Sequence, residues 1–113
     1  MTRMDNALLV ITNVPDEAIG ETIARSVVEQ RLAACVNLLP KIRSVYRWQD
    51  AIEEAGEHTL LVKTAASRYA ELEAAIKALH PYEVPEIIAI PIQAGLPAYL
   101  EWVMQETKKN VDI

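Results

Sequence analysis

The residues best suited to chemistry lie together in one short segment, residues 79–86, which reads LHPYEVPE. The segment combines the His80 imidazole, the Tyr82 phenol and the carboxylates of Glu83 and Glu86 with two prolines, which restrict the backbone and hold the polar groups in place. Imidazole and carboxylate together suit Cu(II), Zn(II) or proton transfer. The same position also suits a structural role, in which His80 ends a helix and its ring meets the last carbonyl groups. The pattern alone leaves both roles open.

Cys35 is the only cysteine of the chain, which excludes an intramolecular disulfide and favours a reducing compartment. We therefore expect a cytoplasmic protein. Its neighbours Ala34 and Val36 are apolar, as is typical of an unreactive core cysteine. No spacing pairs Cys35 with His80 as nucleophile and base, and the sequence has no glycine-rich phosphate loop. The sequence therefore predicts a protein that is not an enzyme.

Five further side chains lie on predicted strands. Lys63 alternates with apolar residues and is expected to direct its amine to water or to an acid. Glu57 and His58 begin the same strand near a turn, and we expect them to face solvent. Tyr46 and Trp48 are predicted to fill a contact between subunits.

The chain has 113 residues, of which 51% are apolar, and this is enough for the core of one domain that spans residues 1–113. Its net charge of −5 disfavours nucleic-acid binding, which requires a basic surface. The start of the chain is polar and lacks the pattern of a secretory signal, and no apolar window is long enough for a membrane helix.

Hydrophobic periodicity predicts strands and helices in alternation. Strands are expected at residues 7–11, 33–48, 57–64 and 85–92, and helices at residues 15–31, 67–80 and 97–108. Pro40 cannot donate to a strand ladder, so a bend, a bulge or an edge position is expected there. Residues 49–56 are predicted to be a polar hairpin tip, and Ser67 is predicted to cap the second helix.

This order, β-α-β-β-α-β with an extra C-terminal helix, predicts an α+β fold, the ferredoxin-like split βαβ sandwich. Two helices would cover one face of the sheet and leave the other face bare. Because that face carries apolar side chains, we expect self-association with the long hairpin as the grip. In the hairpin, residues 42, 44, 46 and 48 should face one way and residues 43, 45 and 47 the other.

Five segments of the sequence together resemble the CutA divalent-cation-tolerance family. They are residues 33–37 (AACVN), 46–48 (YRW), 52–54 (IEE), 61–64 (LVKT) and 80–87 (HPYEVPEI). The resemblance runs from about Leu8 to Trp102. It implies a cytoplasmic, ferredoxin-like homotrimer, similar in assembly to the PII signalling proteins, with a function in tolerance of copper and other divalent ions.

The resemblance also implies a polar cleft between subunits. The matching positions are Cys35, Trp48, Glu57, Lys63, His80, Tyr82 and Glu86. Some members of the family bind Cu(II). The metal-ligating candidates here are His80, Glu83 or alternatively Glu86, and Cys35 of a neighbouring chain.

This sequence departs from the family pattern at three places. Leu79 stands where a second histidine can occur, Thr12 where a cysteine can occur, and residues 50–51 read DA where Gly-Lys is common. Two functions remain open. One is binding of Cu(II) or another divalent cation. The alternative is a PII-like regulatory module for a small anionic metabolite or a partner protein, in which Lys63 supplies the charge and Tyr46 or Trp48 the apolar wall.

Overall fold

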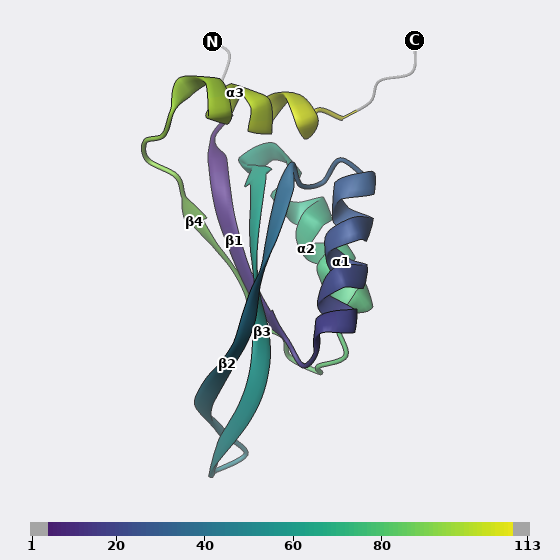
Figure 1. Ribbon diagram of the computed structural model, residues 1–113, viewed down its shortest axis with the longest axis vertical. Helices are drawn as coiled ribbons and strands as arrows, with labels where there is room; N and C mark the ends of the chain where they lie inside the picture. The colour runs from purple at the N-terminus through teal and green to yellow at the C-terminus, as the bar shows by residue number, and fades with distance from the viewer. Residues whose placement is uncertain (1–4, 110–113) are drawn as a thin grey trace.

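The computed structural model describes residues 5–109 and confirms the predicted ferredoxin-like α+β fold. The elements are β1 (Ala7–Val14), α1 (Glu17–Glu29), β2 (Cys35–Trp48), β3 (Ala51–Ala65), the short 3-10 helix η1 (Ala66–Arg68), α2 (Tyr69–Leu79), β4 (Ile87–Pro91) and α3 (Pro97–Glu106). The strands form one antiparallel sheet in the order β2-β3-β1-β4. Helices α1 and α2 lie on one face of this sheet, and α3 lies across the end where β1 begins (Figure 1).

Helix α1 begins where the sequence predicts. The Oδ1 atom of Asp16 accepts a hydrogen bond of 2.8 Å from the backbone N–H of Ile19, which satisfies one free donor of the first turn. Gly20 lies in the buried side of this helix, and a Cβ atom there would lie 3.2 Å from Cγ2 of Val14. The glycine thus allows α1 to approach the sheet closely.

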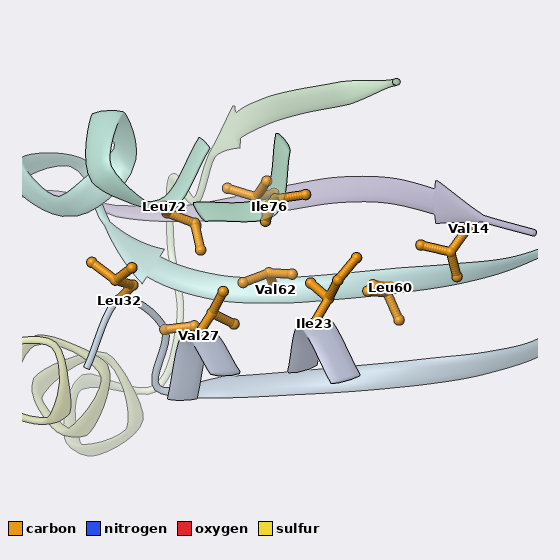
Figure 2. Packing of buried hydrophobic residues seen from close by; sticks show 10 residues of the cluster. Val14, Ile23, Val27, Leu32, Leu60, Val62, Leu72 and Ile76 are labelled. Carbon is orange, nitrogen blue, oxygen red and sulfur yellow. The ribbon is translucent and has the colours of Figure 1, made fainter. Parts of the chain in front are cut away.

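The core lies between α1, α2 and one face of the sheet (Figure 2). Leu60 and Val62 point from β3 into this layer and are fully buried. The helices supply the opposing side chains, which are Ile23, Val27, Leu72 and Ile76. Because successive side chains of a strand point to opposite faces, the residues between these core positions face the other side of the sheet.

That other face is bare in this chain, as predicted. On β4, Ile88 and Ile90 are 48% and 47% exposed. They pair with Ile11 and Leu9 of β1, so their side chains continue an apolar strip across the sheet.

Strand β2 is a single 14-residue strand at the edge of the sheet. Its register shifts between Leu39 and Ile42, so Pro40 lies in a bulge where no ladder donor is needed. The bulge and the edge position are two of the three alternatives that Pro40 predicted. Beyond the bulge, β2 and β3 leave the rest of the sheet as a two-stranded arm (Figure 1), and the molecule reaches 50 Å along its longest axis.

The predicted hairpin tip at residues 49–56 is wrong. The turn consists of Gln49 and Asp50 alone, with φ angles of 49° and 65°, and β3 begins at Ala51. Two left-handed residues are typical of the tight hairpin turn that matches strand twist. The exposed start of β3 is polar or small at most positions, so it lacks the apolar alternation by which a strand is recognised.

The predicted Ser67 cap of the second helix is also wrong. The backbone N–H of Ser67 donates to Oδ1 of Asp5 at 3.0 Å, and its hydroxyl bonds the same carboxylate. Ser67 lies inside η1, and α2 begins at Tyr69. A long-range contact with the start of the chain therefore replaces the local cap. Within residues 5–109, no helix has the length and apolar character needed to cross a membrane.

Candidate functional site

Asn13, near the end of β1, connects three segments that are distant in the sequence. Its side-chain oxygen accepts a hydrogen bond of 2.7 Å from the hydroxyl of Thr59, which lies directly opposite on β3. Its amide nitrogen donates to Oε1 of Glu86 at 3.3 Å. Its backbone carbonyl lies 2.7 Å from Nε2 of His80. One asparagine thus holds together the sheet, the end of α2 and the segment before β4.

Both nitrogens of the His80 ring are engaged. A carbonyl only accepts, so Nε2 donates to Asn13 and carries the proton of the neutral ring, while Nδ1 accepts a 3.2 Å hydrogen bond from the N–H of Tyr82. The residue is only 7% exposed. The alternative in which the ring contacts the last carbonyl groups of the helix is wrong. It is the backbone N–H of His80 that donates to such a carbonyl, that of Ile76, at 2.9 Å. As placed, the ring positions the backbone of Tyr82.

Glu57 is only 7% exposed, so the prediction that it faces solvent is wrong. The residues before β4 fold back over it, and the Tyr82 hydroxyl donates a 2.8 Å hydrogen bond to Oε2 of Glu57. Burial, and then the hydrogen bond and charge of Glu57, raise the pKa of the Tyr82 phenol well above its usual value. Tyr82 therefore remains a neutral donor to this carboxylate at physiological pH. His58 is half-buried, and its Nδ1 has no hydrogen-bond partner among the described residues.

A hollow of about 610 Å³ opens beside this network, between the hairpin arm and the residues before β4. Its lining consists of Asn13, Ser44, Val45, Tyr46, Trp48, Glu57, Tyr82, Glu83, Val84 and Glu86. Ser44, Tyr46 and Trp48 of the predicted face line the hollow, and Val45 of the opposite set does so as well, while Arg43 pairs with Glu54. The hollow contains three carboxylates and, within the described chain, no lysine or arginine among its lining residues. We refer to it as the acidic hollow.

Cys35 and Lys63 lie at the other end of the sheet. They are direct partners across β2 and β3, and Lys63 in turn pairs with Leu9 of β1. Leu9 precedes Asn13 by four residues, or roughly 13 Å along a strand. Lys63 donates to the side-chain oxygen of Asn37 at an exposed position. Neither residue lines the acidic hollow.

The Cys35 thiol lies beside Tyr99 of α3. Burial, and then Cys35, raise the pKa of the Tyr99 phenol. The thiol is half-buried, and α3 covers this end of the sheet.

Comparison with known proteins agrees with the fold. The family model described as "CutA1 divalent ion tolerance protein" matches residues 8–106. The chain belongs to the CutA1 family. The divalent-cation tolerance protein CutA of Thermus thermophilus is 48% identical over 99 residues, which cover 88% of this chain and 96% of the relative. Protein CutA of Mus musculus is 49% identical over 94 residues, which cover 83% of this chain but only 53% of the mouse protein.

The solved structure of the Thermus thermophilus divalent cation tolerance protein superposes on this chain with a TM-score of 0.89. The two chains are 47% identical, and the match covers 90% of this chain and 99% of that one. The CutA1 fold is therefore shared over nearly the whole of both chains.

The donor residues of this CutA1-family chain do not form a complete metal site by themselves. Within residues 5–109, no three or more His, Cys, Asp and Glu side chains are grouped so that they could hold a metal ion. Of the predicted ligands, Glu83 lines the acidic hollow, His80 lies behind it with both nitrogens engaged, and Cys35 is at the other end of the sheet. The chain alone does not bring these three together.

Two positions at which this CutA1 sequence departs from the family pattern have different environments. Thr12 is fully buried on the helix-covered face, and its hydroxyl has no partner among the described residues. Leu79 is 41% exposed next to His80.

Sequence reasoning missed Asn13, Thr59 and Ser44 as site residues. Asn13 and Thr59 are connected only by strand pairing across 46 residues of sequence. The single available signal was the polar Thr12-Asn13 pair at the end of the first apolar run. Such a pair predicts the end of a strand, and the network appears only when the pairing is known.

Proposed function

We propose that this protein takes part in the response to divalent metal ions and that it does so by binding a cation in the acidic hollow. The observation that carries this proposal is the environment of Glu57. Its side chain is 7% exposed in a hollow that also contains Glu83 and Glu86. No ion pair of Glu57 with lysine or arginine is present among residues 5–109.

A buried carboxylate is costly unless it is paired or hydrogen-bonded, and among residues 5–109 only the neutral phenol of Tyr82 donates to Glu57. Two further carboxylates in the same hollow add like-charge repulsion. A bound cation would relieve both costs. For the same reason a small anionic metabolite is disfavoured here, and Lys63, its proposed partner, lies outside the hollow.

We propose further that the functional form is a homotrimer. The exposed apolar strip with Ile88 and Ile90 supports this, since strips of this kind are typical of contact surfaces. Neighbouring copies would also add donor groups to a set that one chain leaves incomplete. We expect light scattering to give three times the chain mass of 12.6 kDa, and a monomeric mass at micromolar concentration would contradict the trimer. The cytoplasmic location stays a prediction from sequence.

Calorimetry with Cu(II) and with Zn(II) tests the cation proposal. We expect wild type to bind, and Glu86→Gln to bind more weakly because one carboxylate of the hollow loses its charge. Glu101→Gln, an exposed position on α3 outside the hollow, is the matched control and should bind as wild type does. Equal affinity of wild type and Glu86→Gln would contradict the placement of the site.

Two more variants assign the remaining ligands. If Cys35 of a neighbouring copy contributes, Cys35→Ser will lower the affinity for Cu(II) even though Cys35 does not line the hollow. If His80 contributes, His80→Ala will lower it as well, with circular dichroism as a check that the network around Asn13 survives.

A further inference from the structure

We propose that cation binding and assembly are coupled in this protein, so that a divalent cation in the acidic hollow stabilises the trimer and loss of the cation weakens it. The inference rests on the proposed function, because it concerns the same cation site and the same assembly. It goes beyond that function by making the assembly of the chains the property that responds to the ion.

The donor groups of the acidic hollow are incomplete in one chain. Within residues 5–109, no three or more His, Cys, Asp and Glu side chains are grouped so that they could hold a metal ion. Sites for divalent cations in proteins usually supply four or more ligands. A second copy or water must therefore complete the set, and the place of the hollow in the fold favours the second copy.

The acidic hollow adjoins the surface that we assign to contacts between copies. Glu57 projects from β3 to the face opposite the buried Leu60. The apolar strip with Ile88 and Ile90 lies on this open face as well. A neighbouring copy that covers the strip therefore also approaches the hollow and would bring its own donor groups to a cation bound there.

Contact between copies makes the carboxylates of the hollow more costly. Glu83 and Glu86 are exposed in a single chain, where water solvates their charges. A neighbouring copy would remove part of this water, and a carboxylate that loses water without gaining an opposite charge is strongly disfavoured. The buried Glu57 adds a third negative charge to the same hollow. Assembly without a cation therefore encloses like charges, and a divalent cation between the copies removes the penalty.

Basic side chains of a neighbouring copy are the competitors for this role. On β2 and β3, Arg43 and Lys63 each bond a side chain of their own copy. Lys41 and Arg47 of the arm have no ion pair among residues 5–109 and are the groups that could replace a cation. The experiment must therefore separate a bound cation from a basic side chain of the neighbour.

Coupling of this kind is reciprocal and has a predictable size. A ligand that binds the trimer and not the unfolded chain stabilises the trimer by mass action. At a free cation concentration of about 100 times Kd, each occupied site should shift the equilibrium between trimer and unfolded chains about a hundredfold. By the same linkage, the trimer should bind the cation more tightly than the separate chains do.

Urea denaturation of the full chain with Zn(II) or with EDTA measures the coupling. Zn(II) serves as the probe because it has no redox chemistry and leaves Cys35 reduced. Circular dichroism follows unfolding, and light scattering gives the mass along the same series. We expect Zn(II) to raise the urea midpoint above that in EDTA, whereas potassium chloride of the same ionic strength does not.

Two variants assign the effect to the hollow. Glu83→Gln removes one negative charge from the lining. In EDTA it should raise the urea midpoint, because the repulsion between enclosed carboxylates is smaller, and it should reduce the gain that Zn(II) gives. Glu29→Gln, an exposed position on α1 that does not line the hollow, is the control, and its gain from Zn(II) should equal that of wild type.

Three results would overturn the inference. Zn(II) that binds in calorimetry but leaves the urea midpoint unchanged would remove the coupling and leave the cation proposal intact. A lower midpoint of Glu83→Gln in EDTA would show that a basic side chain of the neighbour, and not a cation, neutralises the hollow. An equal gain from Zn(II) in Glu83→Gln and in wild type would place the ion elsewhere. Absence of Cu(II) and Zn(II) binding in calorimetry would instead remove the proposed function itself, and the coupling with it.

Discussion

The two faces of the sheet differ in the interactions of their side chains: one packs against helices and the other carries the hydrogen-bond network of the candidate site. On the helix-covered face, Leu60 and Val62 of β3 are fully buried against α1 and α2. On the open face, the alternate residues Glu57 and Thr59 of the same strand bond Tyr82 and Asn13. The period of two along β3 therefore separates stability from the candidate site. Substitutions one residue apart should consequently have different effects.

The largest expected effect is on the helix-covered face. Leu60→Ala should lower the free energy of unfolding by about 2–5 kcal/mol, because a fully buried leucine loses its contacts and leaves a cavity. Urea denaturation followed by circular dichroism measures the change. Ile52→Ala, on the arm, is the control and should change the stability by less than about 0.5 kcal/mol. A loss below about 1 kcal/mol for Leu60→Ala would mean that this face is not the core that the structure shows.

The next largest effect is expected for one of two tyrosine–glutamate hydrogen bonds, of which one involves a buried carboxylate and the other lies on the surface of a helix. Tyr82→Phe removes the hydroxyl that donates to the buried Glu57 and should lower the stability by about 1–2 kcal/mol. Tyr69→Phe removes a bond of 2.7 Å to Glu73 on the surface of α2 and should cost less than about 0.5 kcal/mol. Equal losses in urea denaturation would contradict the special environment of Glu57.

Replacing threonine by valine on each of the two faces should change the stability in opposite directions. Thr12→Val replaces a buried hydroxyl that has no partner among the described residues, and it should raise the stability by about 1 kcal/mol. Thr59→Val removes the 2.7 Å hydrogen bond to Asn13 and should lower the stability by about 1 kcal/mol. Thermal unfolding of the two variants beside wild type measures both changes. Two shifts of the same sign would show that the environments of the two hydroxyls do not differ in this way.

The sequence predicted the helix-covered face well, because its signal is local. Periods of two and of 3.6 residues placed the strands and helices in the right order, and Pro40 correctly indicated that the second strand is irregular or lies at an edge. Local signals failed where a distant contact decided the structure. Serine is a typical helix-capping residue, yet Ser67 forms hydrogen bonds to Asp5, near the start of the chain.

The candidate site was predicted only in part, for the same physical reason. The segment 79–86 was recognised because its polar groups are neighbours in sequence. The burial of Glu57 depends on Tyr82, which is 25 residues away, and the role of Asn13 depends on strand register. Period alone placed Tyr46 and Trp48 on one face of the arm. It did not indicate that the segment before β4 would close a hollow against them.

The smallest expected changes in stability occur at alkaline pH, where the phenols of Tyr69 and Tyr82 titrate. The burial of its ring and the hydrogen bond to Glu73 raise the pKa of Tyr69 to about 12, and burial beside Glu57 raises the pKa of Tyr82 as well. The unfolded chain loses these protons near pH 10, whereas the folded chain retains them. Stability from both phenols is therefore complete below about pH 10 and is lost as the pH rises through the folded values. Urea denaturation from about pH 8 to pH 11 should give a free energy of unfolding that falls above about pH 10, less steeply in Tyr82→Phe than in wild type. An unchanged slope in that variant would mean that the Tyr82 phenol titrates as in the unfolded chain and that Glu57 does not act on it.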